Sequence, residues 1–238
     1  MRNWDDLIKS EVELDTPKYE NNFPYPTNNF RWLIAGPSNS GKTNLLMDAL
    51  FEGLKFDKLY LFVKDPYESK YQFLIKHFTK LEKQIKEETG EEVELLVVGT
   101  EQEDIPRVED LDKRLQNVMV IDDFVVDKKA MDGPISDHFI RGRKKMCSYI
   151  MLQQSYFRTP KLIRINCDNF SLFEMPTKGD IRNIISDHSL DKDYDELKAL
   201  YRECVREKYN FFHIDKKTSD KNMRYRKNLD GFFMQEQE

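Results

Sequence analysis

The sequence predicts an α/β domain whose mostly parallel sheet is covered by helices on both faces. From Phe30 onward, strand-like apolar runs alternate with helical segments, which is typical of parallel strands joined by helical crossovers. Polar residues follow three predicted strands: a glycine loop after 30–35, two aspartates after 117–121 and two glutamines after 148–152. Because such sheets bind ligands at the carboxyl ends of their strands, these features indicate one site.

The strands are predicted from short apolar runs rich in β-branched or aromatic residues. In chain order they are 30–35, 58–63, 94–98, 117–121, 148–152, 169–173 and 211–214.

The helices are predicted from amphipathic spacing and from residues that end a helix. Residues 44–50 place Leu46, Met47 and Leu50 on one face, and the highly charged segment 67–89 ends before Gly90. The other helical segments are 108–115, a loop and helix within 128–145, 178–187 and 193–207.

Two terminal segments flank the P-loop-type domain expected over 30–215. Residues 1–29 are expected to form an irregular arm because three prolines and several asparagines interrupt them. The arm can pack against its own core or against a neighbouring subunit. Residues 216–238 are expected to form a polar C-terminal tail with one aromatic spot at Phe232–Phe233.

Composition excludes several functional classes. The net charge of −5 argues against a globally basic protein that coats nucleic acid, although basic residues cluster at 141–145, 216–217 and 224–227. No apolar run reaches the length of a membrane span, and residues 1–10 lack the apolar core of a signal peptide. The three cysteines have no metal-like spacing, which indicates reduced thiols in a cytosol-like compartment.

The glycine loop matches the phosphate-binding pattern G-x-x-x-x-G-K-[ST], between a predicted strand and a predicted helix. Gly36 and Gly41 allow a tight turn close to phosphates, Lys42 can reach the β- and γ-phosphates, and Thr43 can ligate Mg²⁺. The strand and helix on either side disfavour an ordinary surface turn. The expected ATP contacts are Gly36, Pro37, Ser38, Asn39, Ser40, Gly41, Lys42, Thr43 and Asn44.

Carboxylates and amides supply the other expected site groups. Asp122 is expected to hold Mg²⁺ with Thr43, and Asp123 to orient or deprotonate the attacking water, the alternative being a polar turn. Gln154 is expected to sense the γ-phosphate or to position water, with Gln153 as the competing choice, because alternation sends the two side chains in different directions.

The ordered motifs resemble the viral DNA-packaging ATPases of the poxvirus type, in the FtsK–HerA superfamily of pentameric or hexameric DNA translocases. Similar compact forms occur in small double-stranded DNA viruses, virophages and Polinton-like elements. The resemblance spans residues 30 to about 175. It rests on Gly36–Thr43, Val118–Asp123, Arg141–Lys144, Tyr149–Ser155, Leu162–Asn166 and Phe170–Phe173.

This resemblance implies a homo-oligomeric ring that uses ATP and Mg²⁺ to move double-stranded DNA, held through its phosphates, into a capsid or portal vertex. It implies that the protein acts in the host cytoplasm or viral factory, or in the virion, without a membrane partner. It also implies an arginine supplied by the neighbouring subunit, with Arg143 the first choice, Arg141 the second, and Arg158 and Arg164 as rivals. Family members often have histidine after this arginine, where this chain has Lys144.

Other functions of the same loop are a nucleotide or small-molecule kinase, a helicase and an NTP-dependent assembly switch. The paired aspartates and the strand-end glutamine favour water as the phosphoryl acceptor.

Overall fold

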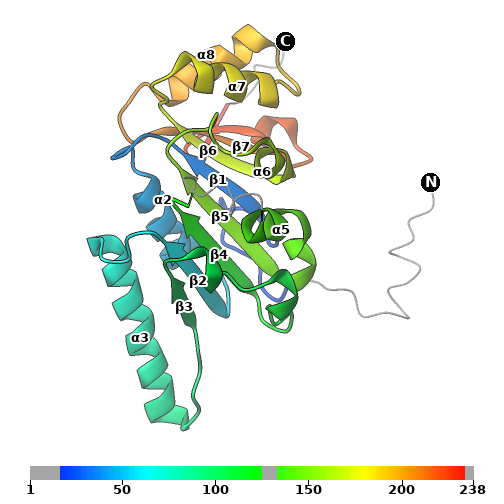
Figure 1. Ribbon diagram of the computed structural model, residues 1–238. Helices are drawn as coiled ribbons and strands as arrows, with labels where there is room; N and C mark the ends of the chain where they lie inside the picture. The colour runs from blue at the N-terminus through cyan, green and yellow to red at the C-terminus, as the bar shows by residue number, and fades with distance from the viewer. Residues whose placement is uncertain (1–16, 125–132, 234–238) are drawn as a thin grey trace, which may run out of the picture.

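Nine strands form one mixed sheet within residues 17–124 and 133–233, the ranges that the computed structural model describes (Figure 1). Their order across the sheet is β3-β2-β4-β5-β1-β6-β7-β8-β9. The strands are β1 (Arg31–Ala35), β2 (Lys58–Val63), β3 (Leu96–Gly99), β4 (Asn117–Asp122), β5 (Cys147–Gln153), β6 (Asn169–Phe173), β7 (Phe211–Asp215), β8 (Tyr225–Lys227) and β9 (Gly231–Phe232).

The six strands from β3 to β6 in this order are parallel, and β7, β8 and β9 continue the sheet in antiparallel fashion. Strand β1 lies between β5 and β6, and Leu33 pairs with both Met151 and Phe170. All five residues of β1 are buried, as expected for a strand covered on both faces. The predicted α/β class with a mostly parallel sheet is therefore confirmed.

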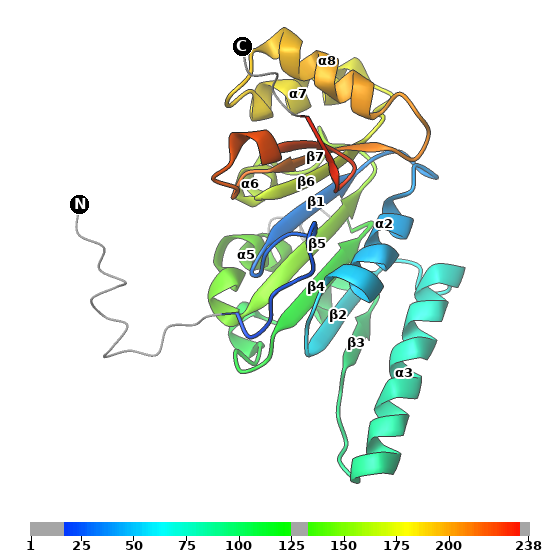
Figure 2. The ribbon, with the colours of Figure 1, turned by 180° about the vertical axis from the view of Figure 1, so that it is seen from behind.

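Helices cover both faces of the sheet, as Figures 1 and 2 show from opposite sides. On one face, α2 and α3 pack against side chains such as Ile34 and Val120; on the other, α5 to α8 pack against Leu33, Met151 and their neighbours. The α-helices are α2 (Lys42–Asp48), α3 (Ser69–Thr89), α5 (Pro134–Arg141), α6 (Lys161–Asn166), α7 (Lys178–His188) and α8 (Tyr194–Cys204). A π-helical turn, η1 (Ala49–Gly53), extends α2, and short 3₁₀ turns are η2 (Gln102–Asp104), η3 (Val108–Asp110), η4 (Gly142–Lys145) and η5 (Lys221–Met223).

Several predicted helices have different bounds in the structure. The helix expected over 108–115 is only the 3₁₀ turn η3, and Asp112 instead pairs with Arg114 in the following loop. The helix expected within 128–145 appears as α5 followed by η4, and residues 125–132 lie outside the described ranges. Helix α6 was not predicted, because its six residues are too few for helical periodicity to be evident.

The prediction of a polar tail over 216–238 is wrong where β8 and β9 form. Strand β8 pairs with β7, and His213 lies opposite Arg226, whose side chain is only 4% exposed. The Arg226 guanidinium lies 3.5 Å from an Asp215 oxygen and donates to the Leu229 carbonyl at 2.9 Å. Strands of three and two residues carry no recognisable period, so they are defined only by the pairing of β8 with β7 and of β9 with β8.

The described part of the arm packs against its own domain. Asn22 donates its backbone N–H to the Gly53 carbonyl at 2.8 Å, and Lys18 forms an ion pair with Asp57 at 2.9 Å. A Cβ atom on Gly53 would lie 2.3 Å from the Tyr25 ring, so this glycine allows the close approach of arm and core. Residues 1–16 lie outside the described ranges.

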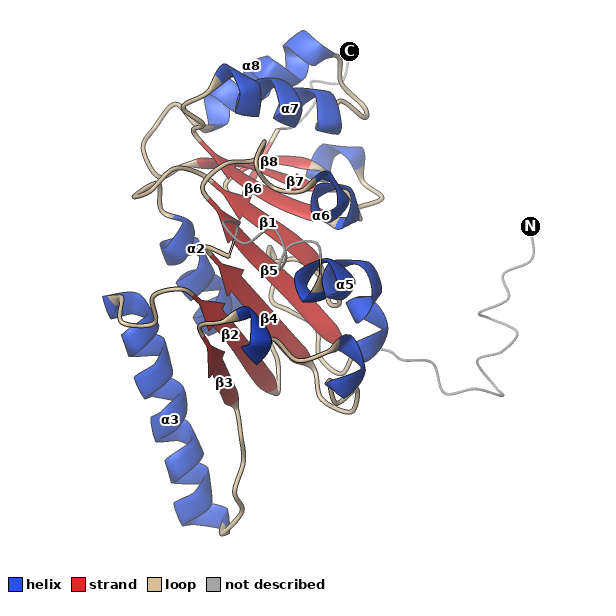
Figure 3. Ribbon diagram, viewed as in Figure 1, coloured by secondary structure: helices blue, strands red, loops and turns tan. Residues whose placement is uncertain are grey.

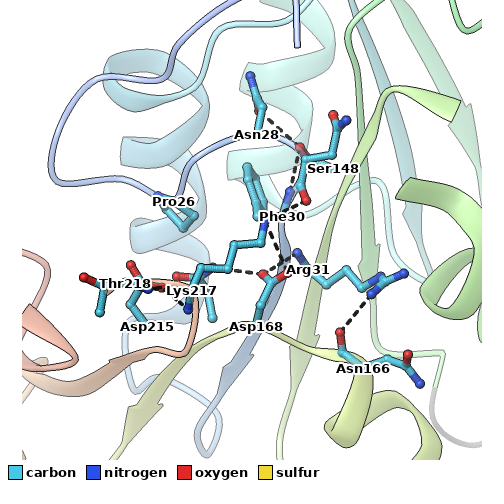
Figure 4. Close-up of polar contacts among 12 residues, drawn as sticks. Pro26, Asn28, Phe30, Arg31, Ser148, Asn166, Asp168, Asp215, Lys217 and Thr218 are labelled. Atoms are coloured by element: carbon cyan, nitrogen blue, oxygen red, sulfur yellow. Dashed lines mark hydrogen bonds and ion pairs between the residues drawn. The ribbon is translucent and has the colours of Figure 1, made fainter. Parts of the chain in front are cut away.

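The amino ends of β1, β5 and β6 are joined by a polar network (Figure 4). Asp168 accepts from the Arg31 backbone N–H at 2.9 Å and lies 3.4 Å from the Lys217 ammonium. The Arg31 guanidinium donates to the Asn166 carbonyl at 3.2 Å. These contacts give Asn166 and Lys217 structural roles at this edge of the sheet.

All three cysteines are buried and unpaired by disulfides. Within the described ranges, each helix is too short or too polar to cross a bilayer.

Candidate nucleotide-binding site

The three polar features predicted at strand ends meet at one edge of the sheet. Strands β4, β5 and β1 are neighbours, so Asp122 lies opposite Leu152 and Ala35 lies opposite Gln153. The glycine loop between β1 and α2 completes a cavity of about 230 Å³. Its lining residues are Ser38, Asn39, Ser40, Gly41, Lys42, Thr43, Glu68, Lys70, Asp122, Asp123 and Gln154.

The glycine loop has the backbone shape that phosphate binding requires. A Cβ atom on Gly36 would lie 2.6 Å from the Ser40 hydroxyl oxygen and 2.7 Å from the Phe173 Cβ. Gly41 has a φ of +112°, a conformation that other residues rarely adopt. Asn44, a predicted contact, is exposed in the first turn of α2 and does not line the cavity.

Lys42 is held inside the loop by backbone carbonyls. Its ammonium donates to the Gly36 carbonyl at 2.7 Å and to the Pro37 carbonyl at 2.9 Å. Burial lowers the Lys42 pKa, and the carboxylates of Asp122 and Asp123 oppose that shift. The partners of this partly buried ammonium within the described ranges are carbonyls, and an anionic phosphate would be a stronger, charge-assisted partner.

Asp122 is a partly buried carboxyl at the end of β4. Burial raises its pKa to about 6, while a hydrogen bond from Tyr71 and the charge of Lys42 favour the ionised form. The Tyr71 hydroxyl donates to Asp122 Oδ2, and its ring is 1% exposed in α3. Sequence reasoning missed Tyr71, because its spacing from Leu74 and Phe78 is that of an ordinary buried helix face.

Asp123 has a φ of +60°, in the left-handed region that non-glycine residues seldom occupy. Aspartate tolerates this conformation better than most residues. Asp123 lines the same cavity as Asp122 and Glu68, so three carboxyl side chains line the cavity expected to hold the phosphates.

The residues present fit Mg²⁺ in the presence of a nucleotide. Thr43 and Asp122 offer oxygen donors, which Mg²⁺ prefers. Among the described residues, no group of three His, Cys, Asp or Glu side chains is arranged to hold a metal alone. That is compatible with Mg²⁺, which commonly uses one or two carboxylates together with water and phosphate oxygens.

The two strand-end glutamines have different surroundings. Gln153 is 2% exposed, and its backbone carbonyl accepts from the Gly36 N–H at 3.0 Å. Gln154 is exposed and lines the cavity. Sheet alternation left this choice open, and the geometry brings Gln154 beside the loop.

The candidate arginines lie in three different places. Arg141 ends α5, which leads through η4 to the amino end of β5, at the opposite edge of the sheet from the glycine loop. It forms ion pairs with Glu109 at 3.2 Å and Asp137 at 3.0 Å. Arg143 lies in η4 next to it, and its side chain lies outside the described part of the structure. The site cavity therefore does not include Arg141.

The two rival arginines differ in burial. Arg164 is buried, forms an ion pair with Asp187 and lies 4.8 Å from the centre of the Tyr156 ring, so it has a structural role. Arg158 is exposed in the loop that follows β5.

Comparisons with known proteins agree with this geometry. A family model described as "Poxvirus A32 protein" matches residues 21–225. The fold resembles that of the genome packaging NTPase B204 from Sulfolobus turreted icosahedral virus 2 in complex with AMP, with 14% identity, a TM-score of 0.56, and coverage of 84% of this chain and 96% of that chain. A comparison with curated proteins finds no match.

Two further structures show the same likeness at 14% identity and a TM-score of 0.54. One is the same NTPase in complex with ATP-gammaS, with 84% of this chain and 96% of that chain covered. The other is B204, the DNA-packaging ATPase from Sulfolobus turreted icosahedral virus, with 84% of this chain and 97% of that chain covered. These findings confirm the predicted fold class and the resemblance indicated by the motifs.

Replacing Lys42 by alanine is expected to weaken ATP binding by about 10- to 100-fold, because the phosphates lose a charge-assisted hydrogen bond. Isothermal titration calorimetry on Lys42→Ala and on the exposed α3 control Lys80→Ala measures this. Equal affinity for ATP in both variants would contradict the assignment of the loop.

Proposed function

Because this chain belongs to the poxvirus A32 protein family, we propose that it is an ATP-driven motor that packages double-stranded viral DNA. The observation that carries the proposal is the cavity shared by the glycine loop, Asp122, Asp123 and Gln154. The fold likeness to B204, a genome packaging NTPase, supports it. ATP is the proposed substrate, and water is the proposed acceptor of the γ-phosphoryl group.

Each residue of the cavity has a proposed task. The loop amides and Lys42 bind the β- and γ-phosphates, and Asp123 orients the attacking water and accepts its proton. Gln154 contacts the γ-phosphate or the water without adding negative charge. Thr43 and Asp122 would hold Mg²⁺, which when bound neutralises charge on the phosphates. Tyr71 keeps the Asp122 carboxyl in place through its hydrogen bond.

We propose that an arginine from the neighbouring subunit completes this site. Arg141 and Arg143 lie at the opposite edge of the sheet from their own glycine loop, which supports a role in trans within a pentameric or hexameric ring. Arg143 is the first choice because of its place in the family motif, and Arg141, which forms ion pairs with Glu109 and Asp137, is the second. A planar guanidinium suits the charge that spreads over the transferring phosphoryl group.

We propose that DNA contacts a basic groove between α7 and α8. The two helices lie together at one end of the sheet (Figure 3), and their groove has a volume of about 220 Å³. Its cations follow helical spacing: Lys178 and Arg182 on α7, Lys198 and Arg202 on α8. None of the four forms an ion pair with another residue of the described ranges, so their charge is free for phosphates.

The C-terminal basic cluster is a weaker candidate for DNA contact. Arg224 pairs with Asp191, Arg226 with Asp215, and Lys217 lies beside Asp168. Its charge is therefore largely compensated within the chain.

The proposed setting for the motor is the host cytoplasm or viral factory, with a capsid or portal vertex as its docking partner.

Double-stranded DNA is expected to stimulate ATP hydrolysis by an oligomer of this chain. ATPase rates with and without DNA, together with particle mass on the same sample, measure this. DNA-independent turnover by a monomer would contradict the motor.

Replacing Asp123 by asparagine should keep ATP affinity and lower turnover by about 100-fold or more, because the water loses its orienting base. Full turnover in Asp123→Asn would show that another group orients the attacking water.

Mixing two inactive variants tests the arginine in trans. Arg143→Ala subunits lack the arginine and Asp123→Asn subunits lack the base, so a mixed ring contains some interfaces with both groups intact. Turnover is expected to recover partly as the mixing ratio approaches one to one. If no ratio restores turnover while mass measurement shows mixed rings, Arg143 does not act in trans, and the Arg141→Ala mixture tests the second choice.

Neutralising Arg182 and Lys198 together is expected to weaken DNA binding and to reduce the slope of log affinity against log salt by about 2. Fluorescence anisotropy with double-stranded DNA at several salt concentrations measures the slope for Arg182→Gln/Lys198→Gln. Lys76→Gln/Lys80→Gln on α3 removes the same charge elsewhere, and an equal change in both double variants would contradict the groove.

A further inference from the structure

A second cavity adjoins the glycine loop on the side away from Asp122. It has a volume of about 240 Å³ and lies between the loop, the end of β6 and the segment that joins α8 to β7. It shares Ser38, Asn39 and Ser40 with the phosphate cavity. A ligand with its phosphates in the first cavity can therefore extend the rest of its structure into the second.

Tyr209 is an exposed aromatic residue that lines this second cavity. It lies in the segment before β7 and is 56% exposed. Its Cδ1 atom lies 3.5 Å from the position that a Cβ on Gly41 would occupy, so the ring is beside the glycine loop. The Lys208 ammonium lies 4.7 Å from the ring centre. An exposed aromatic ring at the edge of a phosphate site offers a flat apolar face to a ligand.

The backbone holds Tyr209 in place at an energetic cost. Its φ of +73° is unusual for a bulky residue, and such outliers cluster at ligand sites. The turn is fixed by Asn210, which donates its backbone N–H to the Glu207 carbonyl at 3.2 Å and its side-chain amide to the Glu207 carboxylate at 3.0 Å. The Asn228 side-chain amide in turn donates to Asn210 Oδ1 at 3.0 Å, which ties the turn to the sheet.

The surroundings of the ring suit a nucleobase. Phe173 is 2% exposed at the base of the cavity, and Glu174 next to it is exposed and makes no hydrogen bond or ion pair with another residue of the described ranges. A free carboxylate can accept a hydrogen bond from an exocyclic amine, while the Tyr209 ring supplies stacking. Phosphate, ribose and base would thus follow one path from the first cavity to the second.

We propose that this cavity is the base subsite of the bound nucleoside triphosphate, with the base stacked on Tyr209. The proposal rests on the nucleotide-binding part of the proposed function and does not require the motor. Tyr209 is then a residue that sets affinity for the base, distinct from the residues that bind the phosphates.

Inorganic triphosphate is the probe that separates the two cavities, because it carries the phosphates and lacks the base. Calorimetry should measure the affinity of ATP and of inorganic triphosphate for the wild type, Tyr209→Ala, Tyr209→Gly and Tyr209→Phe. Loss of the ring should weaken ATP about 5- to 100-fold and leave triphosphate binding unchanged. Tyr209→Phe should keep most of the ATP affinity. Glycine suits the positive φ, so Tyr209→Gly removes the ring without backbone strain.

Phe73→Ala is the matched control, since Phe73 is an exposed aromatic residue (59%) on α3, away from both cavities, and it should bind both ligands as the wild type does. The base subsite is overturned if Tyr209→Ala leaves ATP affinity intact. It is also overturned if that variant weakens ATP and triphosphate equally, because the ring then only supports the loop.

Failure of the proposed function gives a different result. ATP binding that depends on Tyr209, without DNA-stimulated turnover, supports the base subsite and contradicts the motor. DNA-stimulated turnover by a wild type that binds ATP no more tightly than triphosphate supports the motor and contradicts the base subsite.

Discussion

The pairing of β1 with β5 on one side and β6 on the other is the constraint on which the rest of the structure depends. Each residue of β1 is buried, and its register places Ala35 opposite both Gln153 and Leu172. The glycine loop therefore leaves the sheet between the ends of two neighbouring strands. On the β5 side lie the carboxyls and Gln154; on the β6 side lie Phe173 and the Tyr209 turn. One strand position thus creates both cavities, and their shared loop residues join them.

Burial explains the electrostatics at this edge. Lys42 loses hydration, which lowers its pKa, and Asp122 loses hydration, which raises its pKa to about 6. Two backbone carbonyls and the Tyr71 hydroxyl partly compensate for the lost water. A bound phosphate would supply negative charge to Lys42, and a divalent cation would supply positive charge to Asp122. The charges of this edge therefore suit a metal-bound polyphosphate better than a neutral ligand.

The distribution of basic residues follows from the same fold. In the antiparallel part of the sheet, Arg226 is buried in β8 and pairs with Asp215, and Arg224 next to it pairs with Asp191, so a basic stretch of sequence becomes internal structure. On α7 and α8 the cations instead point into a shared groove without acidic partners from the described ranges. An acidic chain with a net charge of −5 can therefore still carry a local surface suited to phosphates.

The sequence by itself determined the phosphate loop, the aspartate pair and the α/β class, because each depends on residues close together in the chain. Gly36 to Thr43 has fixed offsets, and apolar strands alternate with helices in order. Only the tertiary structure decided the positions of Tyr71, Gln154 and Tyr209 beside the glycine loop and the existence of β8 and β9. Tyr71 contacts Asp122, which lies 51 residues later in the sequence, and the order of strands in the sheet brings Tyr209 beside Gly41. Such contacts follow from strand register and long-range packing, which local periodicity does not encode.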